Sequence, residues 1–390
     1  MTTAFTTDNT TRTVAARGVA SLGEPLHSLQ ITRRALRDDD VRIRVDYSGI
    51  CPSDIHNVRG DFGDKPVPLM AGHEIIGTVV GTGSAVARFS VGDRVGVGCF
   101  CDSCGHCDAC RADEEGYCEN GTVMTYASEN RYTDGEVAQG GYATEIVTRD
   151  SFVLRVPDSL DPAAAAPLLC AGITTYSALK HWGAGPGRRV AVVGMGGVGR
   201  VAVKIAVAMG AEVTVLSHSE SERDEALRFG AVDLISTADG SFAKTCSRRF
   251  DLILNTVSVD LDTAAYMATL RFDGVMVQIG LPEQPLSVPV RVPTGQRRSL
   301  AGPLGRRDRR DPGDARLLCG ARCGRGHRAH RRRGRRRRLR PGGPLRRTLP
   351  LRHRRGDDLR LTRFSPADGP PGPVPGPGRP LGRRHRCSRR

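Results

Sequence analysis

The chain has 390 residues, twelve cysteines and a formal charge of +16, and it is long enough for two domains with hydrophobic cores. The charge is concentrated at one end: residues 301–390 contain 29 arginines, no lysine and six aspartates, so residues 1–300 carry −7. The body is mildly acidic, so the overall charge says nothing about its partners. No apolar run approaches the roughly 20 residues of a membrane span, and the N-terminus lacks a signal-peptide core. We expect a cytoplasmic protein without membrane contact, whose cysteines serve as thiols or metal ligands.

Residues 1–160 are predicted to form short strands and turns. Apolar residues alternate with polar ones over 41–50, and buried strands are expected at 74–83 and 93–100, with two closing strands at 140–147 and 152–157. Two prolines, Pro157 and Pro162, then flank a switch to Ala-rich, helix-like sequence. We expect one β-rich domain over 1–160.

From residue 161 to residue 304 the pattern is strand, helix, strand. Strands are predicted at 190–193, 212–216, 252–255 and 275–279, with helices after the first strand and over 221–229. This order is typical of a doubly wound parallel sheet. The fold class is therefore α/β.

The first of these strands runs into Gly194-Met195-Gly196-Gly197-Val198-Gly199, followed by a helical run of Val, Ala and Ile. Strand, G-x-G-x-x-G and helix in this order indicate a dinucleotide site. Gly194 allows the tight turn, Gly196 lets backbone N–H groups approach a pyrophosphate, and Gly199 allows close packing of helix on strand. The alternative is a glycine-rich turn in some other α/β domain.

The strongest local motif is Cys104-x2-Cys107-x2-Cys110-x7-Cys118, within a lobe over residues 99–118. Four thiolates so closely spaced can close a tetrahedral zinc site with no open position, which is a structural site. Cys101 adds another x2 step, so an iron–sulfur cluster on Cys101, Cys104, Cys107 and Cys110 is the alternative. The ferredoxin pattern needs a wider last gap and a following proline, which this sequence lacks. We treat Cys99 and Cys101 as spare thiols.

A second set of metal-ligand residue types is dispersed: Cys51, His73 with Glu74, and Cys170. Taken singly, a buried cysteine is more often a small hydrophobe, and a single histidine more often a core residue. Taken together, two thiolates and an imidazole leave one zinc coordination position open for a substrate, which is typical of a catalytic site.

Several segments resemble the zinc-dependent medium-chain alcohol dehydrogenases, most closely their cinnamyl-alcohol-dehydrogenase-like branch: GICPSDIHNVRGDFG, LMAGHEIIGTV, the four-cysteine lobe, LLCAGITTYSAL and VVGMGGVGRVAVKIA. The resemblance covers roughly residues 15–304. It implies a GroES-like catalytic domain combined with a Rossmann domain, two zinc ions per chain, and homodimers that form through an edge of the Rossmann sheet.

The resemblance also implies roles for single residues. Cys51, His73 and Cys170 become the ligands of a catalytic zinc, Glu74 is a carboxylate that can exchange onto the metal, and Cys104, Cys107, Cys110 and Cys118 bind a structural zinc. Ser53 and His56 match a proton relay with Asp54 beside it, and Thr174 lies near the nicotinamide. Pro52 is a departure, because this branch usually has histidine there. The alternative for His56 is an ordinary histidine in a surface loop.

The implied reaction interconverts primary alcohols and aldehydes, aromatic or aliphatic. Zinc acts as a Lewis acid on the substrate oxygen, and hydride passes between the substrate carbon and a nicotinamide cofactor. The proton leaves through Ser53 and His56, whose ordinary pKa of about 6.5 suits a shuttle near neutral pH.

The second strand of the parallel sheet indicates which nicotinamide cofactor is used. An NAD site places an acidic residue about 20 positions after the first glycines, on the ribose 2′-hydroxyl. Here the strand ends in Ser217-His218-Ser219, with Arg223 soon after, which favours the 2′-phosphate of NADP(H); Glu220 and Glu222 nearby weaken the argument. We also expect Gly197, Val198, Thr256 and Gly280 to line the cofactor site.

Residues 305–390 form an Arg-, Pro- and Gly-rich tail without apolar periodicity, expected to be irregular or disordered. One interpretation is a basic tail that contacts nucleic acid. Another is a binding or regulatory protein of the same fold that has lost turnover with its C-terminal part. We favour a third, an out-of-frame continuation of the family's C-terminus, because GC-rich DNA shifted by one base yields Arg, Gly and Pro in excess.

The genetic code allows a direct check of that interpretation. A one-base shift over Gly305–Ala321 permits GGGTAETREMLDFCAE, a shift over Gly334–Asp358 permits a family-like helix and strand, and the codon spanning Leu359 and Arg360 can become a stop. The tail as written would not supply the edge through which the family dimerises. We expect the gene sequence to show such an alternative frame, and correction of one base near codon 303 to raise the activity of a poorly active chain. A gene without that frame, or full activity of the 390-residue chain, contradicts the interpretation.

Overall fold

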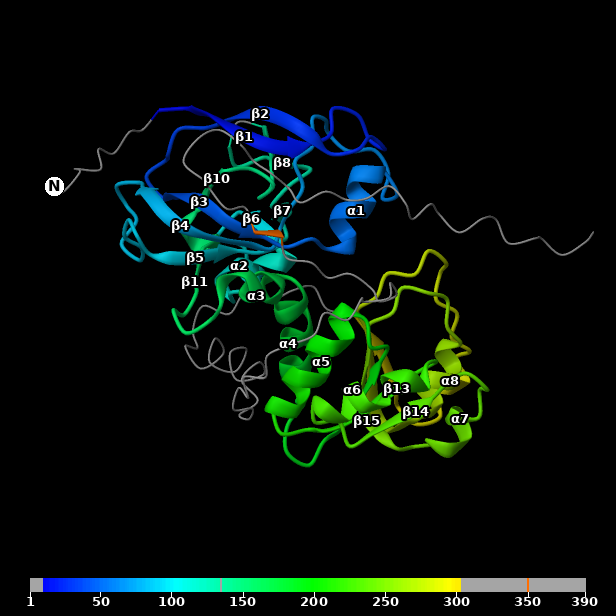
Figure 1. Ribbon diagram of the computed structural model, residues 1–390. Coiled ribbons are helices and arrows are strands. Elements are labelled where there is room, and N and C mark those ends of the chain that lie inside the picture. Colours follow the sequence, from blue (N-terminus) through cyan, green and yellow to red (C-terminus); the bar gives the residue numbers. More distant parts are fainter. Residues whose placement is uncertain (1–9, 134, 303–348, 351–390) are drawn as a thin grey trace, which may run out of the picture. The chain divides into compact units, whose positions relative to one another are not determined.

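The computed structural model describes residues 10–133 and 135–302, together with the backbone of residues 349–350 (Figure 1). The other positions, and with them the expectations for the basic tail, lie outside the described residues. Within the described part, no single helix combines the length and apolar composition that crossing a membrane requires. One bent pair, Pro162–Leu169 with Ala171–His181, meets those two criteria jointly, with a bend of 52° between its members.

The first part of the chain is built on an antiparallel sheet with the strand order β10-β3-β4-β5-β11. The two-residue strand β18 also pairs with β3. A hairpin of β1 and β2 precedes it. The bounds are β1 Arg12–Gly18, β2 His27–Arg33, β3 Asp40–Ser48, β4 Ile75–Thr82, β5 Arg94–Val97, β10 Glu145–Arg149, β11 Leu154–Arg155 and β18 Leu349–Pro350. Helix α1, Pro52–Arg59, lies between β3 and β4 in sequence.

The alternation read from the sequence sets the core of this sheet. Val41, Ile43 and Val45 of β3 are all buried in one cluster with apolar residues of β4, β5 and β10, as period-two spacing requires. The expected strand at 93–100 ends earlier, at Val97, and a separate strand β6 begins at Phe100. Gly98 and Cys99 stand at that break.

A small lobe carries the four closely spaced cysteines. It consists of short elements, β6 Phe100–Asp102, α2 Asp108–Arg111, η1 Glu115–Tyr117, β7 Val123–Met124, β8 Ser128–Asn130 and β9 Glu136–Ala138. Its buried cluster is made of the cysteines themselves, with Ala109 packed against them. Because this lobe buries so little apolar surface, its stability must come from another source, such as a bound metal.

The second part is a parallel sheet with the strand order β14-β13-β12-β15-β16-β17. This is the order of a doubly wound dinucleotide fold. Its strands are β12 Arg189–Val193, β13 Glu212–Ser217, β14 Asp233–Ser236, β15 Phe250–Asn255, β16 Leu270–Gln278 and β17 Ser299–Ala301. The α/β fold class is confirmed, whereas β14 and β17 are short strands that the sequence pattern does not reveal.

Helices cover both faces of this sheet (Figure 1). On β12, Val190 and Val192 face one buried cluster, shared with α4 and α5, while Ala191 and Val193 face the other, shared with α7 and α8. A strand buried on both faces reads as a continuous apolar run, which explains the sequence Val190–Val193. The helices are α3 Pro162–Ala165, η3 Ala166–Leu169, α4 Ala171–His181, α5 Gly197–Ala208, η4 Glu220–Glu222, α6 Arg223–Arg228, α7 Phe242–Thr245, α8 Thr263–Ala268 and α9 Arg291–Thr294, with η2 Asp150–Phe152 in the first part.

Candidate active site

The structure brings the four dispersed residues Cys51, His73, Glu74 and Cys170 together. One ligand atom from each lies within 4.8 Å of every other. Cys51 stands directly before α1, His73 and Glu74 directly before β4, and Cys170 at the junction between η3 and α4. Cys51, His73 and Glu74 are buried, with exposed fractions of 6%, 5% and 1%.

The donor set fits a zinc ion. Zinc–thiolate bonds of about 2.3 Å in tetrahedral geometry place two sulfurs roughly 3.8 Å apart. The Sγ atoms of Cys51 and Cys170 are 3.9 Å apart, although 119 positions separate the two residues in sequence. Two thiolates, one imidazole and one carboxylate also match the ligand types that zinc prefers.

Asp54 holds this set together from the first turn of α1. Its carboxylate is buried, with 2% of the residue exposed. Oδ1 accepts hydrogen bonds from His73 Nδ1 (2.9 Å) and from the backbone N–H of Gly72 (3.1 Å), and Oδ2 accepts from the backbone N–H of Cys51 (2.9 Å). Because a carboxylate can only accept from it, Nδ1 of His73 carries the proton, and Nε2 keeps its lone pair for a metal.

Burial and neighbouring groups shift the pKa values of this cluster. The hydrogen bond with Cys170, together with burial, raises the pKa of the Cys51 thiol. The hydrogen bond with Cys51 lowers the pKa of Cys170, but the contact with Cys99 and burial outweigh it and bring the value to about 11. Burial lowers the pKa of His73, and the Asp54 carboxylate outweighs it, so that the pKa ends well above its usual value. Metal ligands must be deprotonated, so metal binding here releases protons.

The expected relay residues lie on α1 on a different side from Asp54. Ser53 is half-buried, and His56 follows one turn later with 45% of its side chain exposed. Nδ1 of His56 is 2.8 Å from Oδ2 of Asp61, a residue that the sequence analysis did not single out. The motif contains Asp61 five positions after His56, but only the turn that ends α1 at Gly60 brings the two side chains together. Asp54 instead faces the buried His73.

The four closely spaced cysteines form a second cluster. Their Sγ atoms also lie within 4.8 Å of one another, with 3.8 Å between Cys104 and Cys110 and 4.0 Å between Cys107 and Cys118. These distances match those expected around one tetrahedral zinc ion. Backbone N–H groups of Cys104 and Cys107 point at the sulfurs of Cys118 and Cys104, at 3.5 and 3.4 Å. Such bonds favour the thiolate form.

Cys101 does not belong to this cluster. Its thiol donates to the backbone oxygen of Met124 (3.3 Å), and burial raises its pKa to about 12. The set that converges contains Cys118 instead. The geometry therefore supports the four-thiolate zinc site over the iron–sulfur alternative. Cys99, the other spare thiol, forms a hydrogen bond with Cys170 that lowers its own pKa.

The glycine-rich turn has the geometry that its sequence predicts. Gly194 has φ of +86°, which favours glycine, and a Cβ on Gly199 would lie 2.0 Å from the oxygen of Gly194. A Cβ on Gly196 would meet nothing within 4 Å, so open space lies there for a ligand. Helix α5 begins at Gly197, followed by Val198, and its N-terminus offers free backbone N–H donors.

The end of β13 is more crowded than the sequence suggests. Ser217 is buried, and its Oγ donates to Oε2 of Glu222 at 2.7 Å. Arg223 is paired with Asp233 (2.7 Å) and lies 3.7 Å from Glu220. His218 is exposed and Ser219 is half-buried, so both side chains remain accessible. Two serine hydroxyls therefore lie at the end of β13, and that of Ser217 is engaged by Glu222.

Three further residues expected near the cofactor lie at element ends. Thr256 follows β15, and its hydroxyl donates to the oxygen of Val193 (2.7 Å) beside the glycine-rich turn. Gly280 lies two residues after the end of β16. It packs so closely against the backbone of Val257 that a Cβ on Gly280 would lie 1.9 Å from the Val257 oxygen. Thr174 lies in the first turn of α4, four residues after Cys170.

The two sheets, the converging donor sets and the glycine-rich turn together define a class of protein. The chain belongs to the zinc-dependent alcohol dehydrogenase family. The family model for the alcohol dehydrogenase GroES-like domain matches residues 37–158, and the model for zinc-binding dehydrogenases matches residues 197–317. The family resemblance read from the sequence is therefore confirmed.

Among individual proteins, NADP-dependent alcohol dehydrogenase C 1 of Mycolicibacterium smegmatis is 51% identical over 293 residues, which cover 75% of this chain and 83% of that protein. A cinnamyl alcohol dehydrogenase of Sorghum bicolor matches in structure with a TM-score of 0.74 and 35% identity, covering 80% of this chain and 87% of its own. The CAD of Helicobacter pylori, solved in complex with NADP(H), matches with a TM-score of 0.72 and 33% identity, over 80% and 88% of the two chains.

Proposed function

We propose that this protein interconverts primary alcohols and aldehydes, aromatic or aliphatic, with NADP(H) as the hydride carrier. The observation that supports the proposal most strongly is the convergence of Cys51, His73 and Cys170 around one point. The Sγ atoms of the two cysteines are 3.9 Å apart. Three protein donors leave one coordination position for a substrate oxygen, with Glu74 beside it. Reduced thiolates of this kind favour a cytoplasmic location.

Different residues of the site have different roles in the proposed reaction. Cys51, His73 and Cys170 would hold the zinc, which supplies Lewis-acid polarisation of the substrate oxygen while the nicotinamide supplies or takes the hydride. Asp54 fixes the tautomer and orientation of the His73 ring. Ser53 and His56 would carry the hydroxyl proton toward solvent.

Asp61 completes the relay that we propose. Its carboxylate is 2.8 Å from Nδ1 of His56. It therefore orients the ring. The exposed position of His56 allows the proton to reach water.

The cofactor would bind across the ends of β12 and β13. The turn Gly194–Gly199 and the N-terminus of α5 suit a pyrophosphate. The relatives named above that carry a cofactor in their description use NADP. Ser217 and Ser219 offer hydroxyls to a 2′-phosphate, and no carboxylate ends β13, where an NAD site would place one on the ribose hydroxyl.

Cofactor preference tests this proposal. Wild-type protein is expected to reduce aldehydes with a much higher kcat/KM for NADPH than for NADH. Ser217→Asp places a carboxylate against the 2′-phosphate, so the ratio should fall by about 100-fold, since like charges in contact cost several kcal/mol. Glu222→Gln is the matched control, because it removes a carboxylate that now contacts Ser217. It should raise the preference for NADPH or leave it unchanged. Equal kcat/KM values for both cofactors in the wild type would end the NADP assignment, and absence of aldehyde reduction with either cofactor would end the proposed function.

A further inference from the structure

The buried carboxylate of Asp54 also has hydrogen-bond partners from more distant parts of the chain, the hydroxyls of Tyr126 and Tyr142. The hydroxyl of Tyr142 lies 3.1 Å from Oδ2, which also accepts from the backbone N–H of Cys51, and 3.3 Å from the backbone oxygen of Gly49. An ionised carboxylate offers about four acceptor positions. The Tyr142 hydroxyl occupies one of these positions from outside the metal-binding segments.

Tyr142 is held against the segment that leads into His73. Residues 139–142, here called the brace segment, pair with residues 70–72 through three backbone hydrogen bonds: Gly140 N–H to Met70 O (2.7 Å), Gly141 N–H to Gly72 O (2.8 Å) and Tyr142 N–H to Ala71 O (3.0 Å). Gly72 has φ of +102°, and a Cβ there would lie 2.7 Å from the Tyr142 ring. The ring therefore packs directly on the backbone before His73, and its hydroxyl has little freedom to move.

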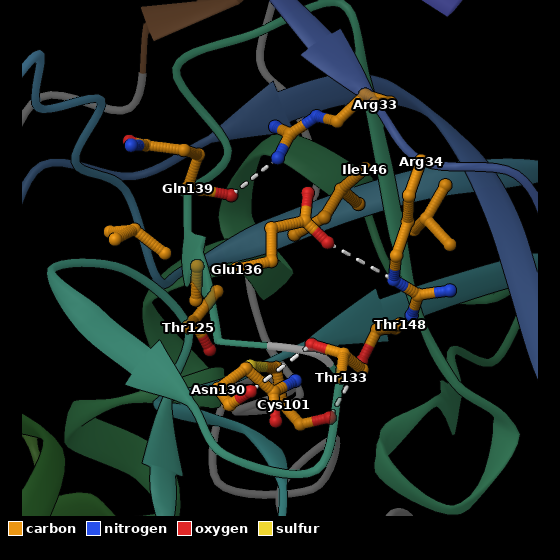
Figure 2. A pocket seen from close by; sticks show the side chains of 13 residues that line it. Arg33, Arg34, Cys101, Thr125, Asn130, Thr133, Glu136, Gln139, Ile146 and Thr148 are labelled. Carbon is orange, nitrogen blue, oxygen red and sulfur yellow. Dashed lines mark hydrogen bonds and ion pairs between the residues drawn. The ribbon is translucent and has the colours of Figure 1, made fainter. Parts of the chain in front are cut away.

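The brace segment is fixed from its other side by a buried cation. The guanidinium of Arg33, at the end of β2, donates to three backbone oxygens: those of Gln139 (2.7 Å), Gly140 (2.8 Å) and Glu145 (2.9 Å). Figure 2 shows this guanidinium directed at Gln139, and both residues line the same pocket. Burial lowers the pKa of Arg33 to about 10, so it stays charged at neutral pH. A buried charge with three acceptors resists displacement, because moving it would leave the charge unpaired.

We propose that Tyr142 is a positioning residue for the catalytic zinc, acting through Asp54. Its hydroxyl holds the carboxylate at the angle at which Oδ1 accepts the Nδ1 proton of His73, so that Nε2 is directed at the two thiolates. The proposal rests on the zinc site of the proposed function. In this proposal the brace segment, which Arg33 holds in place, keeps the zinc ligands in the geometry that binds the metal.

The test measures zinc release from each site of the full chain to a chromophoric chelator. The two release phases are assigned with Cys51→Ser and Cys110→Ser, each of which should remove one phase. Loss of an outer-shell partner typically weakens metal binding by roughly 10- to 100-fold, so Tyr142→Phe should accelerate release from the catalytic site by about 10-fold. Release from the four-cysteine site should not change. Tyr47→Phe, which removes a hydroxyl from β3 of the same domain, should alter neither phase.

A double-mutant cycle separates positioning from a merely structural role. Asp54→Asn alone should accelerate catalytic-site release at least as much as Tyr142→Phe, and adding Tyr142→Phe to it should have little further effect, because both act through one carboxylate. Thermal unfolding is measured alongside, since general destabilisation would accelerate both phases together. Unchanged release in Tyr142→Phe, equal acceleration at both sites, or additive effects in the cycle would each overturn the proposal. A wild-type chain that binds no zinc at the Cys51, His73 and Cys170 site would instead overturn the proposed function.

Discussion

Replacing Cys51 with serine is expected to lower kcat/KM for aldehyde reduction by about 1,000-fold or more and to remove one of two zinc ions. Cys51 is one of only three thiolate and imidazole donors that converge at the candidate catalytic site in the described residues. A catalytic metal supplies several kcal/mol of charge stabilisation in the transition state. Each 1.36 kcal/mol corresponds to about a factor of ten in rate. Metal analysis together with steady-state kinetics provides the measurement.

Cys101→Ser is the matched control for this loss. Cys101 is also a buried thiol, but it donates to the oxygen of Met124, a bond that a serine hydroxyl can keep. This variant should retain both zinc ions and most of the activity. Comparable losses in the two variants would show that the effect of Cys51→Ser reflects damage to the core. Full activity of Cys51→Ser with one zinc missing would show that the converging set is not the catalytic site.

Removing a ligand of the second cluster should unfold the lobe that carries it. In Cys110→Ala we expect loss of the other zinc, rapid backbone hydrogen exchange over residues 100–124 and a clear fall in melting temperature. The lobe has short elements, and its buried cluster consists of the cysteines themselves and Ala109. Structural zinc contributes about 10–16 kcal/mol of binding free energy in small zinc-dependent domains. Such a lobe depends on the metal for its fold.

His106→Ala tests whether this dependence is specific. His106 lies in the same loop and is a common type of metal ligand, but its Nδ1 contacts the backbone oxygen of Cys104. The variant should keep the zinc and the exchange protection of the lobe. Iron with acid-labile sulfide in the purified protein would contradict the zinc assignment, as would unchanged exchange in Cys110→Ala.

Local sequence patterns predict much of the fold. The alternation Val41, Ile43, Val45 predicts β3, because side chains two positions apart share a face of a strand. The glycines Gly194 and Gly199 predict a strand-turn-helix junction, because each conformation depends on the absence of a Cβ at that position. Short strands such as β14 and β17 escaped prediction, because four or fewer residues show no clear period.

The sequence by itself also determined the four-cysteine cluster. Cys104, Cys107, Cys110 and Cys118 lie within fifteen positions, so the turns between them bring the thiolates together with little help from the rest of the fold. For the dispersed set, the residues alone left core packing as an alternative, and the family resemblance decided in favour of ligands.

Only the tertiary structure decided how the catalytic site is supported. It directs Asp54 at His73, pairs His56 with Asp61, places Glu222 on Ser217 and brings Tyr142 onto Asp54 from almost ninety positions away. Sequence spacing reports contacts within one turn or one strand, where backbone geometry fixes the neighbours. Contacts between distant segments depend instead on which buried charges and hydroxyls find partners when the segments pack, because an unpartnered buried polar group costs free energy.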